Sequence, residues 1–478
     1  MLWACLHFPD FSLQLLLRGS KDCGPLAVTT GGNRPQILSC TPEARAQGVA
    51  PGMAVSAAYV LSPQLVEHAR NPNAESRALE ATAAWAGQFT STVSLAPPDS
   101  LLLEIAGSLR LFGGMKPLLQ RLKQEVGELG YRATLAVAPT PSAARLLACA
   151  GMNIIIGNLS KLESVLAELP LSLLQQAKDT IDSLALMGIR NIGECLQLPR
   201  EGIARRFGQG LLDELDRALG RLPDPRSTWN VPARYKSRLV LPTPVHEAAP
   251  LLFAANRLIL EMAGWLHMQQ AGVTRLKLIL HHEDRKPTVV TLSFSVPSRD
   301  PRRILALLRE KLSILTLPDR VEAIVLESAE ARPLDSRNLS LFPEDRLPEE
   351  ERWLIIEHLR ARLGSEAVHG IITYPDHRPE LAWRCCEPGN SAISEGQSLP
   401  RPLWLLEQPR RLSSADGMPI LDTPLALITG PEQIESGWWD DNDATRDYFV
   451  AADSNDRRFW VFHERSGSAE WFLHGVFA

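Results

Sequence analysis

The chain has 478 residues, of which 45% are hydrophobic and 22% are charged, and its formal net charge is −5. This ordinary globular composition suits about three to four domains of ~100–200 residues and excludes disorder throughout, and no run approaches the ~18 uncharged apolar residues of a membrane span. Seven scattered cysteines without a C-x-x-C pair exclude a zinc ribbon or a disulfide framework, and they predict a cytoplasmic protein.

Residues 1–160 are predicted to alternate between strands and helices. Short apolar runs predict the strands, and Ala and Leu at helical spacing predict the helices. The predicted strands are 1–8, 101–107 and 131–139, and the predicted helices are 74–93, 115–130 and 141–151. Elements that alternate in this way form an α/β or α+β layer around a shared core.

Residues 161–230 carry a helical pattern and no strand signal. Within them, short predicted helices flank a turn that contains Gly188 and Arg190. This arrangement suits a helix–hairpin–helix unit, in which turn amides and helix N-termini hold a phosphate. A small structural hairpin without a ligand fits the same pattern, so both interpretations stay open.

Residues 231–332 show the clearest pattern, with segments in the order β-α-β-β-α-β. This order predicts a four-stranded antiparallel sheet with two helices on one face. The stretch 234–332 holds 15 Lys and Arg against 10 Asp and Glu, so it carries +5 within a chain of −5. A basic module in an acidic chain is compatible with phosphate contact, and equally with a solvated surface.

The composition changes after residue 332. Residues 333–350 are predicted to be a linker that holds an apolar pentad, residues 351–429 an extension and linker, and residues 430–478 a Trp-rich module. The last 41 residues contain 10 of the 29 aromatic residues, in an alternating pattern that predicts a small β module. Aromatic residues anchor interfaces, but they also fill small cores, so both roles are open for them.

Three segments carry a family resemblance. They are SCTPEARAQGVAPGM at 39–53, PPDSLLLEIAGS at 97–108 and VAPTPSAARLLA at 137–148. These segments resemble the fingers and palm of Y-family (UmuC-like) translesion DNA polymerases, and the likeness covers about residues 1–332.

The resemblance implies the fold class, an α+β multidomain chain. It implies a palm and fingers at 1–160, a helical thumb with the helix–hairpin–helix at 161–230, and a little finger at 231–332. The C-terminal extension with its small β module follows these domains.

The sequence departs from the catalytic site that the resemblance implies. Active members hold two Mg²⁺ ions with three carboxylates, because Mg²⁺ prefers oxygen ligands. Here His7 and Ser100 occupy two of the three positions, and Asp99 keeps the only carboxylate. Arg45 keeps a vestigial nucleotide contact, and Ser12 replaces a bulky aromatic gate. The sequence therefore predicts a pseudo-polymerase without catalysis, metal or cofactor.

An alternative interpretation is a weakly active translesion polymerase with a shifted carboxylate site. Asp10, Asp99 and Glu104 are the carboxylates near the degenerate positions. Asp99 and Glu104 are five residues apart, so an extended strand turns them to opposite faces. The alternative therefore needs an irregular strand.

The apolar pentad resembles a known docking peptide. Asn338, Leu339, Ser340, Leu341 and Phe342 resemble the Q-L-[SD]-L-F peptide that binds bacterial sliding clamps. Leu and Phe anchors contribute about 1.5–3 kcal/mol each when a partner buries them. A short edge strand of the little finger is the alternative interpretation of these residues.

A Y-family body without its carboxylates, followed by a clamp peptide and a Trp-rich tail, resembles the degenerate members encoded in bacterial SOS mutagenesis cassettes. The resemblance implies an adaptor in DNA damage-induced translesion synthesis, which links the β sliding clamp, a RecA-like ImuA protein and an error-prone C-family DNA polymerase α subunit. The sequence predicts weak, non-specific DNA binding, and it also predicts binding of protein partners. The DNA-binding candidates are Arg275, Lys277, Arg285, Lys286, Gly188 and Arg190, and the partner-binding candidates are Trp438, Trp439, Trp460 and Trp471.

Overall fold

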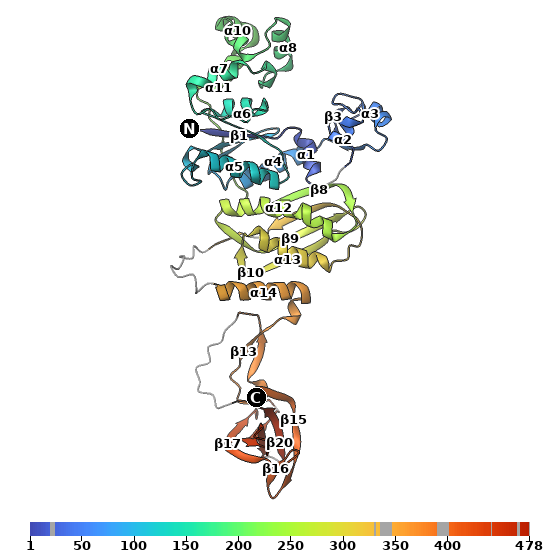
Figure 1. The fold of residues 1–478 in the computed structure, drawn as a ribbon, viewed down its shortest axis with the longest axis vertical. Coiled ribbons are helices and arrows are strands. Elements are labelled where there is room, and N and C mark those ends of the chain that lie inside the picture. The colour runs from blue at the N-terminus through green and yellow to red at the C-terminus, as the bar shows by residue number, and fades with distance from the viewer. Residues whose placement is uncertain are drawn as a thin grey trace. The chain divides into compact units, whose positions relative to one another are not determined.

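A computed structural model describes residues 1–19, 24–328, 331–334, 347–389, 401–440, 442–465 and 469–477. The chain divides into two compact units, Met1–Arg362 and Leu363–Ala478 (Figure 1). Both helices and sheets build the first unit, whereas sheets dominate the second, so the predicted α+β multidomain class is confirmed. None of the helices in the described part of the chain is long and apolar enough to cross a membrane.

A four-stranded antiparallel sheet forms the centre of the first unit. Its strands are β1 (Trp3–His7), β5 (Val93–Ala96), β6 (Ser100–Glu104) and β7 (Thr134–Ala138), in the order β5-β6-β1-β7. Alternate residues of β1 enter two different cores, because Ala4 and Leu6 pack in one cluster while Trp3 and Cys5 pack in another. Helices therefore cover both faces of the sheet.

Three helices supply these two cores. They are α4 (Pro72–Ala86), α5 (Met115–Glu128) and α6 (Pro141–Cys149). Leu79 of α4 and Leu118 of α5 share a core with Leu6, while Ala143 of α6 shares the other core with Cys5. The sequence predicted these three helices and the strands β1, β6 and β7, because each carries its own local apolar period, whereas β5 was not predicted.

A small α/β lobe follows the first helix, α1 (Phe11–Leu17). Its elements are β2 (Leu26–Thr29), β3 (Ile37–Cys40), β4 (Val66–Ala69), α2 (Pro42–Ala46) and α3 (Val55–Leu61), with the strand order β3-β2-β4. Thr41 caps α2 by accepting a hydrogen bond from the amide of Ala44, and Ala44 is fully buried. The Thr-Pro-Glu-Ala-Arg segment therefore begins a helix with a regular N-cap.

Short helices form the next region, which packs on α6. They are α7 (Leu162–Ala167), α8 (Lys178–Leu186), α9 (Ile192–Leu196), α10 (Arg200–Phe207) and α11 (Gln209–Ala218). Their apolar residues share the core of Ala143, so this region is one extension of the central layer. Gly188 ends α8 with φ +85°, a conformation that glycine adopts without strain.

The predicted β-α-β-β-α-β module is confirmed. Its strands are β8 (Lys236–Val245), β9 (Ala271–His282), β10 (Thr288–Ser298) and β11 (Val321–Ser328), with helices α12 (Ala248–Met268) and α13 (Pro301–Ser313). The strand order is β10-β9-β11-β8, and the short strand β12 (Ala331–Pro333) adds to β9. Apolar residues of α12 and α13 share one core with Leu278 of β9 and Leu326 of β11, so both helices lie on one sheet face (Figure 1).

A buried ion pair joins this module to the central layer. Arg18, which follows α1, donates to Glu261 of α12 at 3.0 Å, and the two residues are 3% and 0% exposed. Tyr131 accepts from Arg18, and Tyr235 donates to Glu261 at 2.8 Å, so each charge has several partners. Trp85 of α4 lies against Gly264 of α12, where a β-carbon would come within 2.7 Å of the indole ring.

Helix α14 (Leu347–Leu363) continues the first unit beyond the sheet. Its Glu357 is 5% exposed, accepts a hydrogen bond from the amide of Ser295 at 2.8 Å and pairs with Arg303 of α13. Ala361 enters the core of the sheet. The helix therefore packs beside β10 and α13, within the stretch that the sequence analysis describes as linker and extension.

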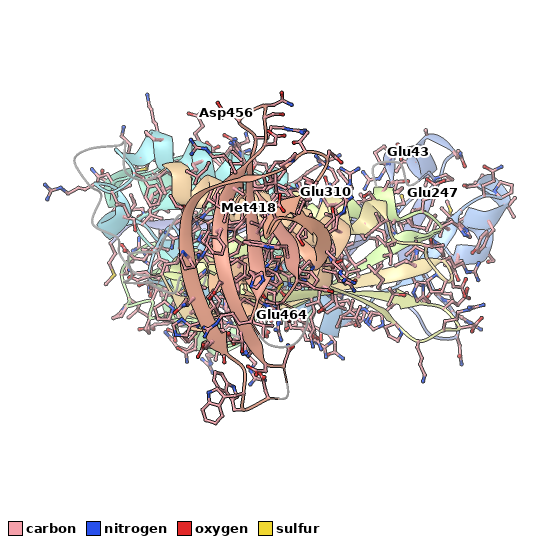
Figure 2. All side chains as sticks on the ribbon, turned by 90° about the horizontal axis from the view of Figure 1, so that it is seen from below. Glu43, Glu247, Glu310, Met418, Asp456 and Glu464 are labelled. Atoms are coloured by element: carbon pink, nitrogen blue, oxygen red, sulfur yellow. The ribbon has the colours of Figure 1, made fainter. Side chains whose placement is uncertain are left out.

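The second unit holds a hairpin and a six-stranded sheet. The hairpin pairs β13 (Gly370–Thr373) with β14 (Trp383–Cys386). The sheet has the order β16-β15-β20-β19-β18-β17, from β15 (Trp404–Ala415), β16 (Met418–Ile420), β17 (Ala426–Ser436), β18 (Ala444–Ala452), β19 (Arg458–Glu464) and β20 (Trp471–Val476). Figure 2 shows these strands side by side, with Asp456 and Glu464 towards opposite ends of the sheet. The β module is thus confirmed, and it begins at β15, before the Trp-rich segment at 430–478.

Candidate functional site

The degenerate palm positions lie together at the end of β1. The register pairs His7 with Ser100, which begins β6. Nδ1 of His7 lies 3.1 Å from Oγ of Ser100, 3.2 Å from Oδ1 of Asp99 and 3.7 Å from Sγ of Cys149. Ser100 also donates to Asp99 at 3.0 Å. The structure therefore brings together all three residues that the sequence singled out here, and it adds Cys149 of α6.

His7 and Asp99 form an ion pair at neutral pH. Burial by itself would lower the pKa of His7, but the hydrogen bonds to Asp99 and Cys149 outweigh it and raise that pKa to about 9. Burial would likewise raise the pKa of Asp99, yet the hydrogen bond from His7 holds it below its usual value. The two shifts agree, so an imidazolium supplies the positive charge beside the single remaining carboxylate.

A pocket of about 180 Å³ opens beside this pair. It is lined by Asp10, Phe11, Ser12, Leu38, Ser39, Arg70, Glu75, Pro98 and Asp99. Ser12 donates to the buried Glu75 at 2.6 Å, and Arg70 donates to both oxygens of Glu75, at 2.9 Å and 2.7 Å. These bonds hold the pKa of Glu75 below its usual value, although burial opposes them. The small Ser12 thus leaves room for a carboxylate–guanidinium pair.

Arg70 and Glu75 were not singled out in the sequence. They stand five residues apart across the start of α4, so neither strand nor helix periodicity connects them. The predicted nucleotide contact, Arg45 of α2, lies 3.6 Å from Asp10, and both side chains are about half exposed. An exposed pair of this kind contributes ~1 kcal/mol or less.

The shifted carboxylate site is not assembled. Glu104 lies at the far end of β6, opposite Trp3, and accepts a hydrogen bond from the amide of Leu2 at 3.1 Å. Asp99 lies at the other end of that regular strand, where it lines the pocket with Asp10. The expectation that Glu104 could join them is therefore wrong, because regular pairing holds it a strand length away. Over the described residues, no group of three or more His, Cys, Asp or Glu is placed to hold a metal ion.

The second sheet presents a basic face on the side that α12 and α13 leave open. Arg275 and Lys277 of β9 are exposed, and they alternate with core residues such as Leu276 and Leu278. Lys277 lies opposite Thr291 of β10 on one side and Glu327 of β11 on the other. Residues directly opposite share a face, so the strands align these polar groups in rows.

Two further cations extend this basic face. Lys236 and Arg238 of β8 are exposed, and Lys236 lies opposite Glu327, which it contacts at 2.6 Å. The pKa of His281 is lowered by burial and by the nearby charges of Arg238 and Lys236. Sequence reasoning missed both residues, although their alternation with buried Ser237 and Leu239 carries the same period-two signal as β9.

The predicted contacts Arg285 and Lys286 lie in the turn between β9 and β10 rather than on the open face. Both are exposed, and Nε of Arg285 is 3.9 Å from Asp319. The strand turn therefore places these two cations at the end of the sheet, where they add to the positive charge of the module.

The helical hairpin already bonds its own amides. Asn191 caps α9 in a capping box with Glu194, whose side chain accepts from the amides of Arg190 and Asn191, at 2.6 Å and 3.4 Å. The carboxylate of Glu194 thus occupies the position that a phosphate needs at this helix N-terminus. Gly188 shapes the turn, and the exposed Arg190 side chain is the group that can reach a ligand.

The four predicted partner-binding tryptophans divide into two kinds. Trp460 and Trp471 are 2% and 7% exposed, and each belongs to a core cluster of the six-stranded sheet. The prediction that these two contact a partner is wrong, because β19 and β20 turn them into the cores. Trp438 and Trp439 are 79% and 59% exposed, in the turn between β17 and β18.

The candidate clamp peptide, residues 338–342, lies outside the described residues. Described elements flank it on both sides. Before it, β12 pairs with β9, and after it, α14 packs on the sheet through Glu357.

Residues 13–149 match the impB/mucB/samB family. Over 457 residues the chain is 26% identical to Protein ImuB of Caulobacter vibrioides, and the match covers 90% of this chain and 100% of that protein. DNA polymerase IV 2 of Mesorhizobium japonicum is 29% identical over 219 residues, which are 45% of this chain and 52% of that protein.

Similar solved structures include an insertion ternary complex of Dbh DNA polymerase, with a TM-score of 0.40 and 19% identity over 70% of this chain and 100% of that chain. The crystal structure of DinB from Sulfolobus solfataricus matches with the same identity and coverage and a TM-score of 0.38. The chain thus carries a match to the impB/mucB/samB family over residues 13–149 and is similar over 90% of its length to Protein ImuB.

Proposed function

We propose that this protein acts in DNA damage-induced mutagenesis as a non-catalytic adaptor on primer-template DNA. The observation that carries the proposal is the pair of His7 and Ser100 at the positions where Y-family polymerases hold carboxylates. The similarity to Protein ImuB over 90% of the chain supports the same role.

The chemistry of the palm supports the absence of polymerase activity. Nδ1 of His7 is 3.2 Å from Asp99, and the pKa of His7 is raised to about 9 by this partner and Cys149 against the effect of burial. A divalent cation beside Asp99 would meet an imidazolium, which repels it and offers no free lone pair at the nitrogen that faces Asp99. Asp99 alone cannot hold the two ions that primer activation and triphosphate binding need.

The basic sheet face supports contact with DNA. Arg275 and Lys277 of β9 lie on the open face together with Lys236 and Arg238 of β8, and β11 runs between the two strands. Thr291 of β10 adds a hydroxyl opposite Lys277. Cations and hydroxyl groups bind phosphates and carry no sequence information. We therefore expect weak binding that is independent of sequence and falls steeply with salt.

The pentad at 338–342 supports contact with a β sliding clamp. It lies between β12 and α14, which are both held on the second sheet. This position suits a peptide that is presented to a partner while the body stays on DNA. The proposed adaptor would then bring a RecA-like protein and an error-prone C-family polymerase to the same clamp through its second unit.

A primer-extension assay tests the absence of catalysis. Purified full-length protein is supplied with primer-template DNA, all four nucleotides, and either Mg²⁺ or Mn²⁺. We expect no extension, because His7 and Ser100 supply no carboxylate. Template-dependent extension that Asp99→Ala abolishes would show that a metal site forms, and it would overturn the proposal in favour of a weak polymerase.

A clamp-binding measurement tests the adaptor role. Leu341→Ala combined with Phe342→Ala should weaken binding to a purified β sliding clamp by about a hundredfold, since two apolar anchors are lost. Leu403→Ala with Ile371→Ala is the control, because these two residues are apolar, lie outside the pentad and are 83% and 71% exposed. A fall in melting temperature with unchanged clamp affinity would instead make the pentad part of the core.

A further inference from the structure

The turn between β17 and β18 presents two adjacent indole rings to solvent. This tryptophan turn, Gly437–Asp440, contains Trp438 and Trp439, whose rings meet edge to face with centroids 5.5 Å apart. They are 79% and 59% exposed, and neither belongs to the core clusters of the sheet. The pair therefore contributes little to the cores, and its exposure needs another explanation.

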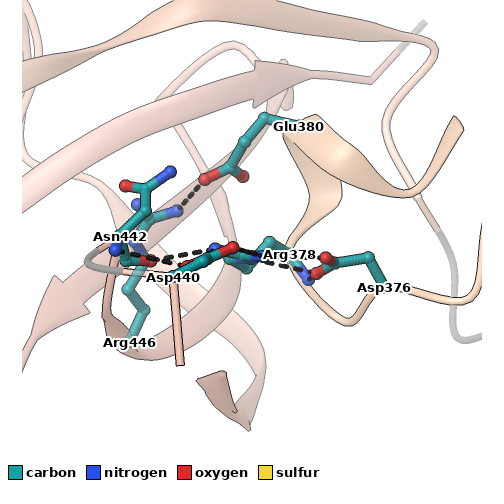
Figure 3. Close-up of polar contacts among 6 residues, drawn as sticks. All are labelled: Asp376, Arg378, Glu380, Asp440, Asn442 and Arg446. Carbon is teal, nitrogen blue, oxygen red and sulfur yellow. Dashed lines mark hydrogen bonds and ion pairs between the residues drawn. The ribbon is translucent and has the colours of Figure 1, made fainter. Parts of the chain in front are cut away.

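A buried arginine stabilises the tryptophan turn through hydrogen bonds to Asp440 and Asn442. Arg378, which lies between β13 and β14, is 2% exposed. It donates to both oxygens of Asp440, at 2.9 Å and 2.7 Å, and to the carbonyl of Asn442 at 3.0 Å (Figure 3). Asp376 accepts from Nε and Nη2 of the same guanidinium, at 3.0 Å and 2.9 Å. The guanidinium thus holds both the Asp440 side chain and the Asn442 carbonyl.

The backbone at Gly437 leaves no room for a side chain. Its φ is +92°, and a β-carbon there would come within 2.2 Å of the carbonyl of Asn442 and 2.6 Å of the Arg378 guanidinium. The Arg378 guanidinium also lies 5.7 Å from the ring centroid of Trp439. A turn fixed in this way loses little conformational entropy when a partner covers it, which is the property of a preorganised anchor.

The charge of the second unit indicates what kind of partner fits. Residues 363–478 contain 9 Arg, no Lys and 18 Asp or Glu, which gives a net charge of −9. Arginines near the turn are already paired, since Arg465 contacts Glu435 at 2.6 Å and Arg446 contacts Glu380 at 2.9 Å. Such a surface repels a phosphate backbone and attracts cations.

We propose that the tryptophan turn is a preorganised docking site for a protein surface on which apolar side chains are flanked by Lys or Arg. The indole rings pack against these apolar side chains, and exposed carboxylates of the acidic second unit pair with the flanking cations. This inference deepens the proposed adaptor function and rests on it, because it assigns one partner contact to a defined turn and gives the chemistry of that partner.

The probe is a short helical peptide with Leu on one face and Lys on the other, labelled for fluorescence anisotropy and mixed with the full-length protein. Trp438→Ala with Trp439→Ala should weaken its binding by at least about tenfold, as expected for two aromatic anchors. Trp404→Ala is the matched control, because Trp404 is 71% exposed in the same unit but lies in β15. The Trp404→Ala variant should bind the peptide as tightly as the unchanged protein does.

Two more variants test the role of the positioning residue. Arg378→Lys keeps the charge but loses the forked donor geometry, and it should weaken peptide binding severalfold with both tryptophans in place. Gly437→Ala should also weaken peptide binding severalfold, because the added β-carbon would displace the backbone of the turn. Hydrogen exchange of the β18 and β19 amides shows whether the sheet stays folded in each variant, so local loosening is distinguished from loss of the module.

Three outcomes would overturn the inference. The double Trp variant could bind the peptide as tightly as the unchanged protein does, or the unchanged protein could bind a Glu-and-Leu peptide as tightly as the Lys-and-Leu peptide. In the third, the double Trp variant loses binding of labelled oligo-dT but keeps binding of the peptide. Clamp binding measured on the same variants tests the adaptor role separately. If clamp binding persists while the peptide results fail, only the assignment of the turn falls.

Discussion

The two compact units of this chain carry opposite charge. The first unit, Met1–Arg362, holds 41 Lys and Arg against 37 Asp and Glu, a net charge of +4, whereas Leu363–Ala478 carries −9. The units also use tryptophan differently. Trp85 and Trp265 are 1% and 0% exposed in the first. The second also buries Trp460 and Trp471, but its Trp438 and Trp439 face solvent. This difference in charge fits the proposal that the first unit contacts phosphates and the second contacts proteins.

Among the described residues, each unit also contains one buried arginine, and the two have separate roles. Arg18 joins two layers of the first unit through Glu261, and the two residues are 243 positions apart. Arg378 holds a surface turn of the second unit through Asp440, 62 positions away. A buried guanidinium must be paired, because an isolated charge costs several kcal/mol. The same chemistry thus stabilises a domain interface in one unit and shapes a surface in the other.

The largest expected effect is a loss of stability that is confined to the first unit. Glu261→Ala leaves Arg18 buried without its carboxylate, which should cost about 3–5 kcal/mol of the free energy of unfolding. The loss should appear in the transition of the first unit alone, measured by urea unfolding with hydrogen exchange as the site-specific readout. Glu247→Ala, which removes an exposed carboxylate just before α12, is the control and should change little. Equal destabilisation of both units would contradict their independence.

The charge difference gives the next prediction. Arg275→Ala with Lys277→Ala should lower DNA affinity by about tenfold or more at low salt and reduce the slope of log affinity against log salt by about two, since two phosphate contacts are lost. Arg410→Ala with Arg411→Ala removes the same charge from exposed positions of β15 and should leave DNA binding nearly unchanged. If the second pair weakens binding as much as the first, the basic sheet face is not the DNA contact.

A smaller effect distinguishes the units by pH. Burial, assisted by Arg446 and opposed by Glu380, lowers the pKa of His474 to about 4, and His474 is 1% exposed beside Tyr448. A neutral buried histidine favours folding above its ordinary pKa of about 6.5, so the second unit should lose this contribution as pH falls from there towards 4. His474→Gln should reduce that acid sensitivity, as measured by thermal melting between pH 4 and 7.

The stability of the first unit should depend on pH in the opposite direction. The pKa of His7 is raised to about 9 by Asp99 and Cys149, against the effect of burial. Its ion pair should therefore stabilise the first unit fully below pH of about 6.5 and lose this contribution as pH rises through about 9. Asp99→Asn should bring the pKa of His7 down, which a pH titration of the imidazole NMR signals measures directly. An unchanged pKa in that variant would show that Asp99 is not the partner.

Much of the fold follows from local sequence patterns. The β-α-β-β-α-β order at 231–332 is confirmed because each strand and helix carries its own period, and the same holds for the strands at 1–8, 101–107 and 131–139. Register then follows from the apolar alternation, since Lys277 faces solvent only if Leu276 and Leu278 face the core. The sequence also identified His7, Asp99 and Ser100 as one group, through the spacing of a resembling family.

The long-range pairings were decided by the tertiary structure alone. Nothing local connects Arg18 with Glu261 or Arg378 with Asp440, because their pairing depends on how distant elements pack. The sequence likewise indicated four tryptophans as partner-binding candidates, yet β19 and β20 bury Trp460 and Trp471 while a turn exposes Trp438 and Trp439. A side chain's type sets what it can contribute when buried or bound, and only the packing around it decides which of the two occurs.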